Sequence, residues 1–258
     1  MKLYYRMFLM HLRSQMEYKA SFFMMSIGIM ITSLGDLLAI SFLMMRFHTV
    51  KGFTLPQILL CYSVMVLSYT FAELIGRGFD HFQQVLKNGD FDRIMLRPVR
   101  IMPQVFLARM NLERISKAVL AGVVLIYAMS RSGVVWAMDR ILVLILMILG
   151  GTLMFTGLFI LHAVVCFFTL EGLEVMNILT DGSRSYGEYP VSIYGKEMLK
   201  FYTYVIPVAL IQYYPLLYIL GRTGDFRFGL LPLFGALFLV PCFFLWKFGV
   251  RRYKSNGS

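Results

Sequence analysis

Charged side chains are scarce in this sequence. Asp, Glu, Lys and Arg make up 15% of its 258 residues, hydrophobic residues make up 59%, and the mean hydropathy is +0.70. A soluble domain averages about a quarter charged and about half apolar residues. The apolar residues also come in long blocks that basic segments separate. This distribution excludes an ordinary soluble domain and indicates a chain whose solvent is the lipid bilayer.

The sequence also lacks the residues that a disulfide framework or a zinc site needs. Its three cysteines, Cys61, Cys166 and Cys242, lie within apolar blocks and share no metal-ligand spacing. Disulfide frameworks use an even number of cysteines, and zinc sites use closely spaced pairs. We therefore predict that the three thiols pack in the core, and that the chain holds no metal and no cofactor of its own.

Common catalytic motifs are absent too. The chain has no G-x-x-x-x-G-K-[ST] phosphate loop, no H-E-x-x-H zinc motif and no G-x-S-x-G nucleophile elbow. Its formal charge of +11 can indicate nucleic-acid binding. The Lys and Arg residues sit between the apolar blocks, however, where loops at a membrane surface carry them. We expect neither an enzyme nor a nucleic-acid partner.

Six apolar blocks are candidate membrane spans. A helix needs about 20 apolar residues to cross a hydrocarbon core about 30 Å thick. Five blocks reach that length, and the third is shorter and carries Arg114 and Lys117 in its first turns. The predicted spans are about 20–45, 55–76, 114–130, 141–170, 201–221 and 228–248. The sequence thus predicts an all-α integral membrane protein of about six transmembrane helices, in a single domain over residues 1–258.

The distribution of basic residues predicts the orientation. With six spans, the segments on the side of the N-terminus hold 19 Lys and Arg residues, and the other loops hold 6. Without the short third span the division would be 16 to 9. Because basic residues concentrate on the cytoplasmic side, we predict cytoplasmic N- and C-termini. Residues 1–19 form either an amphipathic interfacial helix, which we favour, or a merely basic tail.

The inner segment 83–98 has the pattern of a short helix between two turns. Asn88-Gly89 favours a turn, Asp90 can cap a following helix, and Pro98 must end it, because a residue before proline avoids helical geometry. An apolar stripe recurs within it at i, i+3 and i+4: Phe91, Ile94 and Met95. Such a helix could dock in a groove on a partner protein or lie flat on the membrane. The pattern alone leaves both possibilities open.

The same segment resembles a family signature. The run from Gly89 to Pro98, GDFDRIMLRP, resembles the cytoplasmic G-x-h-D-x-h-L-h-R-P motif (h apolar) of small type-2 ABC export permeases. Met95 departs from it, since the family usually has leucine there, but the residue stays apolar. Downstream, YPVSIY at 189–194 and the prolines at 207 and 215 resemble the family's YP-x-x-IY … IP-x-A … P stretch. The resemblance extends over nearly the whole chain.

This resemblance implies a function and a set of partners. Two permease subunits, identical or paralogous, would form the pathway through the bilayer of a bacterial cytoplasmic membrane. Two ATP-binding subunits would dock from the cytoplasm and hold the ATP and Mg²⁺. The docking residues would be those of the coupling helix and its flanks: Gly89, Asp90, Phe91, Asp92, Ile94, Met95, Leu96, Arg97 and Pro98. The alternative is a secondary transporter or channel, which needs no ATPase.

Ionisable residues and prolines at membrane depth are further candidates. Asp36 and His162 fall well inside predicted spans, where a charge costs about 2.5–3.5 kcal/mol. They could line the substrate path or a subunit interface, or form interhelical hydrogen bonds that only fix packing. Glu73 lies one helical turn before Arg77 and is expected to pair with it. Pro207 and Pro215 are expected to bend the fifth span, as gating or as inert kinks.

Overall fold

The structure of the chain is a computed structural model that describes Met10 and residues 17–108, 111–169 and 174–254. Throughout these ranges the regular elements are helices, and the β-type pairing is a single bridge between Val50 and Phe53. The predicted interfacial helix over residues 1–19 lies almost entirely outside the described residues. The all-α architecture expected from the sequence is confirmed.

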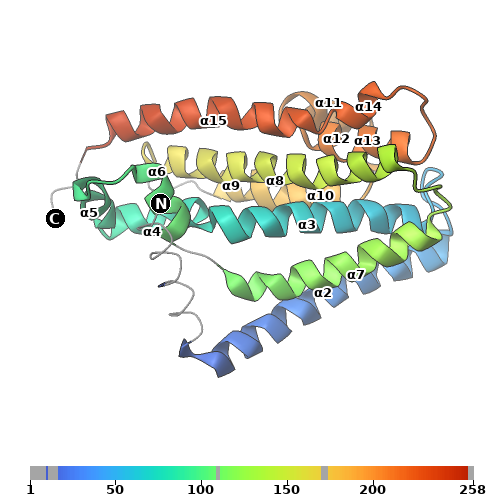
Figure 1. The fold of residues 1–258 in the computed structure, drawn as a ribbon, viewed down its shortest axis with the longest axis horizontal. Helices are drawn as coiled ribbons and strands as arrows, with labels where there is room; N and C mark the ends of the chain where they lie inside the picture. The colour runs from blue at the N-terminus through green and yellow to red at the C-terminus, as the bar shows by residue number, and fades with distance from the viewer. Residues whose placement is uncertain (1–9, 11–16, 109–110, 170–173, 255–258) are drawn as a thin grey trace.

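Five long helices form the body of the molecule. They are α2 (Lys19–Phe47), α3 (Leu55–Asp80), α7 (Ile115–Arg131), α8 (Met138–Cys166) and α15 (Leu233–Arg252). They lie side by side in the order α15, α8, α3, α7, α2 (Figure 1). Four stretches are long and apolar enough to cross a membrane: Lys19–Phe47, Leu55–Lys87, Met138–Cys166 and Arg227–Arg252. Helix α7, with 17 residues, is shorter.

Short helices gather at one end of this row. They are α4 (Phe82–Lys87), α5 (Asp90–Leu96), α6 (Ile101–Ala108) and the 3₁₀ turn η1 (Leu112–Arg114). We call this end, on the left of Figure 1, the α5 end. The opposite end carries the turns over residues 48–54 and 220–226. Arg222 of the second turn donates a hydrogen bond to the carbonyl oxygen of Gly52 in the first.

Residues 174–194 run along α3 from the α5 end to the opposite end. The segment contains α9 (Glu174–Asn177), the π-helical turn η2 (Ile178–Gly182), α10 (Ser183–Gly187) and the 3₁₀ turn η3 (Val191–Tyr194). Tyr69 of α3 donates a hydrogen bond to Asp181 at 2.6 Å, and Lys51 donates one to the carbonyl oxygen of Ser192 at 2.7 Å. The sequence placed this segment in an inner loop, and the structure instead packs it against the central helix.

The predicted fifth span, 201–221, is not one helix. The structure divides it into α11 (Lys196–Tyr204), α12 (Val208–Ile211) and α13 (Tyr213–Ile219). The break follows from Pro207, which has no N–H to donate and stands at the N-cap of α12. Because Ser192 and Arg222 both contact the 48–54 turn, the three helices form a hairpin that enters and leaves at the opposite end. Helix α14 (Arg227–Leu230) then leads into α15.

Glycines allow the central helices to approach closely. A Cβ added at Gly235 of α15 would overlap the carbonyl oxygen of Gly150 on α8. A Cβ added at Gly151 would lie 2.5 Å from the Ser68 hydroxyl of α3. Small residues at such crossings are typical of helix packing in membranes. The three cysteines are buried thiols in these packed regions, as the sequence predicted.

Candidate functional site: helix α5 and the buried ion network

Helix α5 begins and ends as its sequence dictates, with one correction at its start. Gly89 adopts a left-handed φ of 71° and occupies the N-cap, so Asp90 lies in the first turn rather than capping it. At the other end Arg97 is extended, with ψ 136°, because Pro98 follows it. The helix that the sequence predicted between Asp90 and Pro98 is therefore observed over Asp90–Leu96.

One face of α5 is buried in an aromatic cluster of its own chain. The Phe91 ring is fully buried and lies 5.2 Å from Phe82, 5.4 Å from Phe167 and 4.8 Å from Tyr253, centroid to centroid. Ile94 packs against the same cluster. These rings come from α4, from the end of α8 and from the residue after α15. Phe91 and Ile94 thus fix α5 to the bundle and are not available to a partner.

Two hydrogen-bonding groups strengthen this attachment. The Tyr253 hydroxyl is bonded to the Asp92 carboxylate, and burial together with that carboxylate raises the pKa of Tyr253, so the phenol stays protonated and donates. Gln104 of α6 donates to the carbonyl oxygens of Ile94 at 3.2 Å and of Val99 at 3.1 Å. Helix α5 is therefore attached to Tyr253, the residue after α15, and to α6.

The other face of α5 is open to a partner. Leu96 is 85% exposed and Met95 is 39% exposed, so two neighbouring apolar side chains of α5 are free of contacts that would bury them. Three exposed charged side chains lie on the same short segment as Met95 and Leu96. Arg93 and Asp90 are 3.6 Å apart, and Arg97 follows Leu96 directly. The exposed apolar pair is thus Met95 and Leu96, rather than the stripe that helical periodicity predicted.

Comparison with known families shows which family the chain belongs to. A family model described as "ABC-2 family transporter protein" matches residues 30–257, which is most of the chain. The chain belongs to the ABC-2 transporter family. It is therefore a membrane component of an ABC transporter. Neither the curated proteins nor the solved structures give a match to it.

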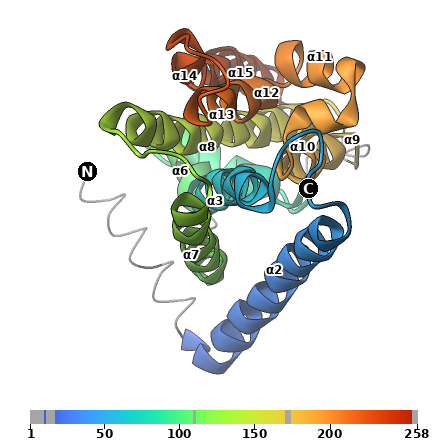
Figure 2. The same ribbon diagram turned by 90° about the vertical axis from the view of Figure 1, so that its right-hand side faces the viewer.

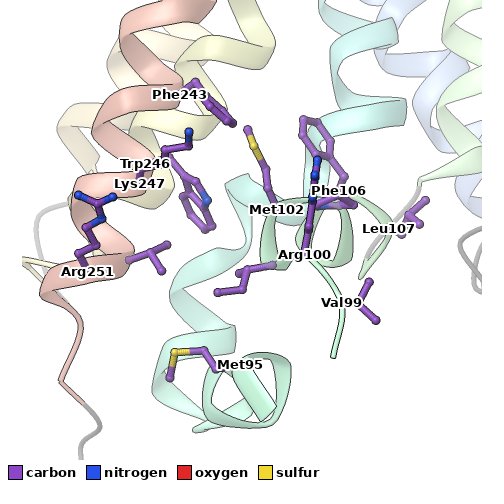
Figure 3. A pocket seen from close by; sticks show the side chains of 13 residues that line it. Met95, Val99, Arg100, Met102, Phe106, Leu107, Phe243, Trp246, Lys247 and Arg251 are labelled. Carbon is purple, nitrogen blue, oxygen red and sulfur yellow. The ribbon is translucent and has the colours of Figure 1, made fainter. Parts of the chain in front are cut away.

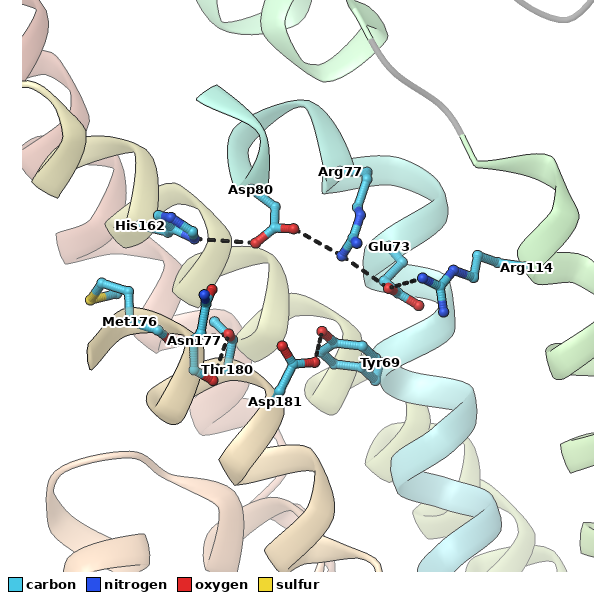
Figure 4. A network of polar contacts seen from close by, with 10 residues as sticks. All are labelled: Tyr69, Glu73, Arg77, Asp80, Arg114, His162, Met176, Asn177, Thr180 and Asp181. Carbon is cyan, nitrogen blue, oxygen red and sulfur yellow. Dashed lines mark hydrogen bonds and ion pairs between the residues drawn. The ribbon is translucent and has the colours of Figure 1, made fainter. Parts of the chain in front are cut away.

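The ABC-2 chain holds an ion network between its helices at the α5 end. Figure 4 shows its central part, in which Arg77 of α3 lies 3.0 Å from Glu73 and 2.8 Å from Asp80. Arg114, at the start of α7, approaches Glu73 from the other side at 3.5 Å. Glu73 and Arg77 form the pair that their one-turn spacing predicted. The Glu73 side chain is almost completely buried, so its charge depends on these two cations.

His162 extends the network to α8. Its Nδ1 lies 3.1 Å from the Asp80 carboxylate, which joins α8 to α3 (Figure 4). His162 is buried, and a dashed line in Figure 4 joins it to Asp80. The sequence left two roles open for His162, and this contact is an interhelical hydrogen bond of the kind that fixes packing.

A second group of charges lies on the segment 174–194. Arg184 and Glu188 form an ion pair at 3.4 Å, one turn apart on and just after α10. Asp36 of α2 is half-buried and interacts electrostatically with both, although it makes no direct ion pair with another described residue. Asp36 thus lies near the Arg184–Glu188 pair, and its role in a path or an interface stays a prediction.

The two prolines have different roles in the permease. Pro207 separates α11 from α12 and makes the turn of the hairpin. Pro215 lies in the first turn of α13, and the carbonyl oxygen that its missing N–H leaves without a helical bond is that of Ile211, the last residue of α12. The break between α12 and α13 therefore falls where the sequence placed a bend, and a role of Pro215 in gating stays a prediction.

The sequence did not single out several members of these networks. Asp80, Asp181, Arg184 and Glu188 lie outside the patterns on which the sequence predictions rest, and Arg114 was noted only as a charge in the short third span. The one available signal was the spacing of Arg184 and Glu188, since opposite charges at i and i+4 favour a helix. The contacts His162–Asp80, Tyr69–Asp181 and Arg114–Glu73 join residues 82, 112 and 41 positions apart, and no local pattern reveals these three.

Proposed function

We propose that this chain is the permease subunit of an ABC exporter, in which two copies or paralogues move substrate outward by alternating access. Two separate ATP-binding subunits would supply the energy and would hold the ATP and Mg²⁺. The α5 end would face the cytoplasm of a bacterial cell, within the cytoplasmic membrane. The observation that carries the proposal is α5 itself: a short helix, rigidly fixed by one face, with Met95 and Leu96 exposed on the other.

The distribution of charge supports this orientation. With residues 174–194 as the fifth crossing and α11–α13 as a hairpin from the outside, Lys196, Lys200, Arg222 and Arg227 belong to the outer side. The inner segments then hold 16 Lys and Arg residues, the outer loops hold 8, and Arg184 lies between. The ratio still favours cytoplasmic termini by the positive-inside rule.

The proposed mechanism follows from how α5 is attached. When the ATPases close on ATP, a socket that holds Met95 and Leu96 moves α5. Because Phe91 packs on Tyr253 and Phe167, this motion passes to α15 and to α8 rather than being absorbed by a loop. Interlocked aromatic side chains transmit displacement well, since packed cores are dense and stiff.

A pair of variants tests the docking and the transmission separately. Leu96→Glu places a charge in the apolar contact, and we expect it to abolish co-purification of the ATPase in mild detergent while the permease still folds. Lys254→Glu, a change at another exposed position of the same end, should retain the ATPase. Tyr253→Phe should keep the ATPase bound but reduce the coupling of ATP hydrolysis to transport. Unchanged ATPase recovery with Leu96→Glu would refute the assignment of α5.

A secondary transporter is the alternative that one observation favours. Such proteins use paired ionisable residues inside the membrane, and Asp80–His162 and Glu73–Arg77 are pairs of this kind. The two functions differ in their energy source. Transport in vesicles that needs ATP inside and continues after a proton gradient is collapsed supports the exporter, and the reverse supports ion coupling.

A further inference from the structure

An apolar groove with a basic rim opens between α5, α6 and α15. Its volume is about 860 Å³, within the range of about 300–1,000 Å³ of small-molecule sites. Figure 3 shows Met102 and Phe106 of α6 facing Phe243 and Trp246 of α15 across it. This groove is separate from the ion network and from the exposed Leu96 side chain.

The charged residues at the groove are all cations. Arg100 precedes α6, and Lys247 and Arg251 lie one turn apart on α15 (Figure 3). All three side chains are exposed, and no carboxylate occurs among the residues that line the groove. The Lys247 ammonium lies 4.3 Å from the Phe243 ring centroid, so it stands directly above the apolar part. The site therefore combines a positive mouth with an apolar interior.

The apolar interior continues along α15. A second hollow shares Met102, Phe106 and Phe243 with the groove and extends to Leu239 and Val240. From Arg251 to Val240 is 11 residues, or about 16 Å of helix. That length is close to half of a hydrocarbon core about 30 Å thick. The groove and its extension thus have the depth of one leaflet.

We propose that this groove binds an anionic phospholipid of the inner leaflet. The phosphate would lie between Arg100, Lys247 and Arg251, and an acyl chain would follow Phe106 and Phe243 toward Val240. Basic pockets between helices at the cytoplasmic surface suit anionic head groups, and Trp246 beside Lys247 is typical of the membrane–water interface. The inference rests on the proposed function in one respect, which is that the α5 end faces the cytoplasm.

Such a lipid would also contact the coupling helix. Met95 of α5 and Val99, which follows it, line the same groove. The lipid would fill the space between α5–α6 and α15 on the side away from Phe91. It would therefore add a third attachment, beside the aromatic cluster and the Asp92–Tyr253 bond.

The intrinsic fluorescence of the chain gives a direct test. The sequence has two tryptophans, Trp136 and Trp246, so Trp136→Phe leaves Trp246 as the only reporter. The purified variant is titrated in detergent with phosphatidylglycerol or phosphatidylcholine carrying brominated acyl chains. We expect saturable quenching of Trp246 by phosphatidylglycerol, at a mole fraction about tenfold or more below that needed for phosphatidylcholine.

Matched variants show whether the rim causes this preference. Arg100→Gln, Lys247→Gln and Arg251→Gln together should move the phosphatidylglycerol curve onto that of phosphatidylcholine. Lys19→Gln, Lys87→Gln and Lys254→Gln together remove the same charge from exposed positions outside the groove, and should leave the curve unchanged. Native mass spectrometry of both proteins provides a second measurement, the number of anionic lipids retained after purification.

Three outcomes would overturn the proposal. They are equal quenching of Trp246 by the two lipids, an equal loss of the phosphatidylglycerol preference in both triple variants, and displacement of the brominated lipid by inorganic phosphate alone. The last would mean a simple anion site. Because every measurement uses the permease without its ATPase, a failure here leaves the docking of α5 to be decided by co-purification.

Discussion

Helices α2 and α3 are nearly equal in apolar character and opposite in burial. The mean hydropathy of their most apolar stretches is 1.9 and 1.8, yet 17% of those residues are buried in α2 and 83% in α3. Helix α3 lies between α8 and α7, whereas α2 lies at the edge of the row and diverges from it (Figure 2). Hydropathy therefore shows that both helices suit a membrane, but not what covers them.

The charges of the two helices fit this difference. Helix α3 carries Glu73, Arg77 and Asp80, which other side chains neutralise. Helix α2 carries Asp36 at mid-length, and its long outer face is apolar. A helix in the middle of the row can hold charges because side chains of neighbouring helices pair with them. The exposed face of a helix at the edge must be covered by lipid or by a second copy of the chain. Four predictions test this contrast, beginning with the largest effect.

A large side chain in place of a glycine should leave the fold stable on α2 and should destabilise it where α8 contacts α3. Gly151→Leu on α8 would drive a Cβ into Ser68 of α3, whereas a Cβ at Gly35 of α2 meets nothing within 4 Å. We expect Gly151→Leu to cost more than the about 1–3 kcal/mol typical of overpacking, because the conflict is between the stems of two helices. Thermal unfolding in detergent, followed by size-exclusion chromatography, should show little folded protein.

Gly35→Leu should behave like the unmodified chain in the same assay. If it instead prevents assembly of a dimer while each chain remains folded, α2 is covered by a second copy rather than by lipid.

Removing the central cation of α3 should be the next most damaging change. Arg77→Ala leaves the carboxylates of Glu73 and Asp80 without the guanidinium that lies between them. Breaking a buried ion pair costs about 3–5 kcal/mol. Arg46→Ala, at the exposed end of α2, should change stability by about 0.5 kcal/mol or less. Equal melting temperatures for the two variants would show that the network is screened by solvent.

Truncating one leucine on each helix compares their surroundings directly. Leu60 of α3 is 1% exposed and Leu38 of α2 is 55% exposed. Leu60→Ala should cost about 2 kcal/mol or more through the cavity that it leaves. Leu38→Ala should stay within about 0.5 kcal/mol, since lipid fills the space. Chemical denaturation in mixed micelles measures both, and a large cost at Leu38 would again indicate a covering subunit.

The sequence was informative wherever a local rule governs the structure. Long apolar blocks predicted α2, α3, α8 and α15, and a shorter block with two charges in its first turns predicted α7, because an apolar stretch has few alternatives to a helix in lipid. Pro98 and Gly89 determine the bounds of α5 through their own backbone restrictions. The motif GDFDRIMLRP indicated the same family that the match over residues 30–257 shows.

The sequence misled wherever distant partners decide the outcome. Residues 174–188 contain Asp181, Arg184 and Glu188, so their hydropathy is low, yet Tyr69 and the Arg184–Glu188 pairing allow them to pack against α3. Residues 201–221 are apolar, but Pro207 divides them and the pieces fold back as a hairpin. The stripe on α5 was assigned to a partner, although the chain's own aromatic cluster occupies it. Each error concerns which other parts of the chain pack against a segment, and the hydropathy of the segment carries no information about its packing partners.

The smallest effect belongs to the single hydrogen bond between α3 and the segment 174–194. Tyr69→Phe removes the hydroxyl that donates to Asp181 at 2.6 Å and leaves the ring contacts with Phe155 and Phe159 intact. Hydrogen bonds inside membrane proteins average about 0.6 kcal/mol in double-mutant cycles, so we expect a loss of about that size. Thr32→Val on α2 is the control, since its hydroxyl bonds only within its own helix. A cycle with Asp181→Asn isolates the coupling: an additive cycle would show that α3 holds this segment by apolar packing alone.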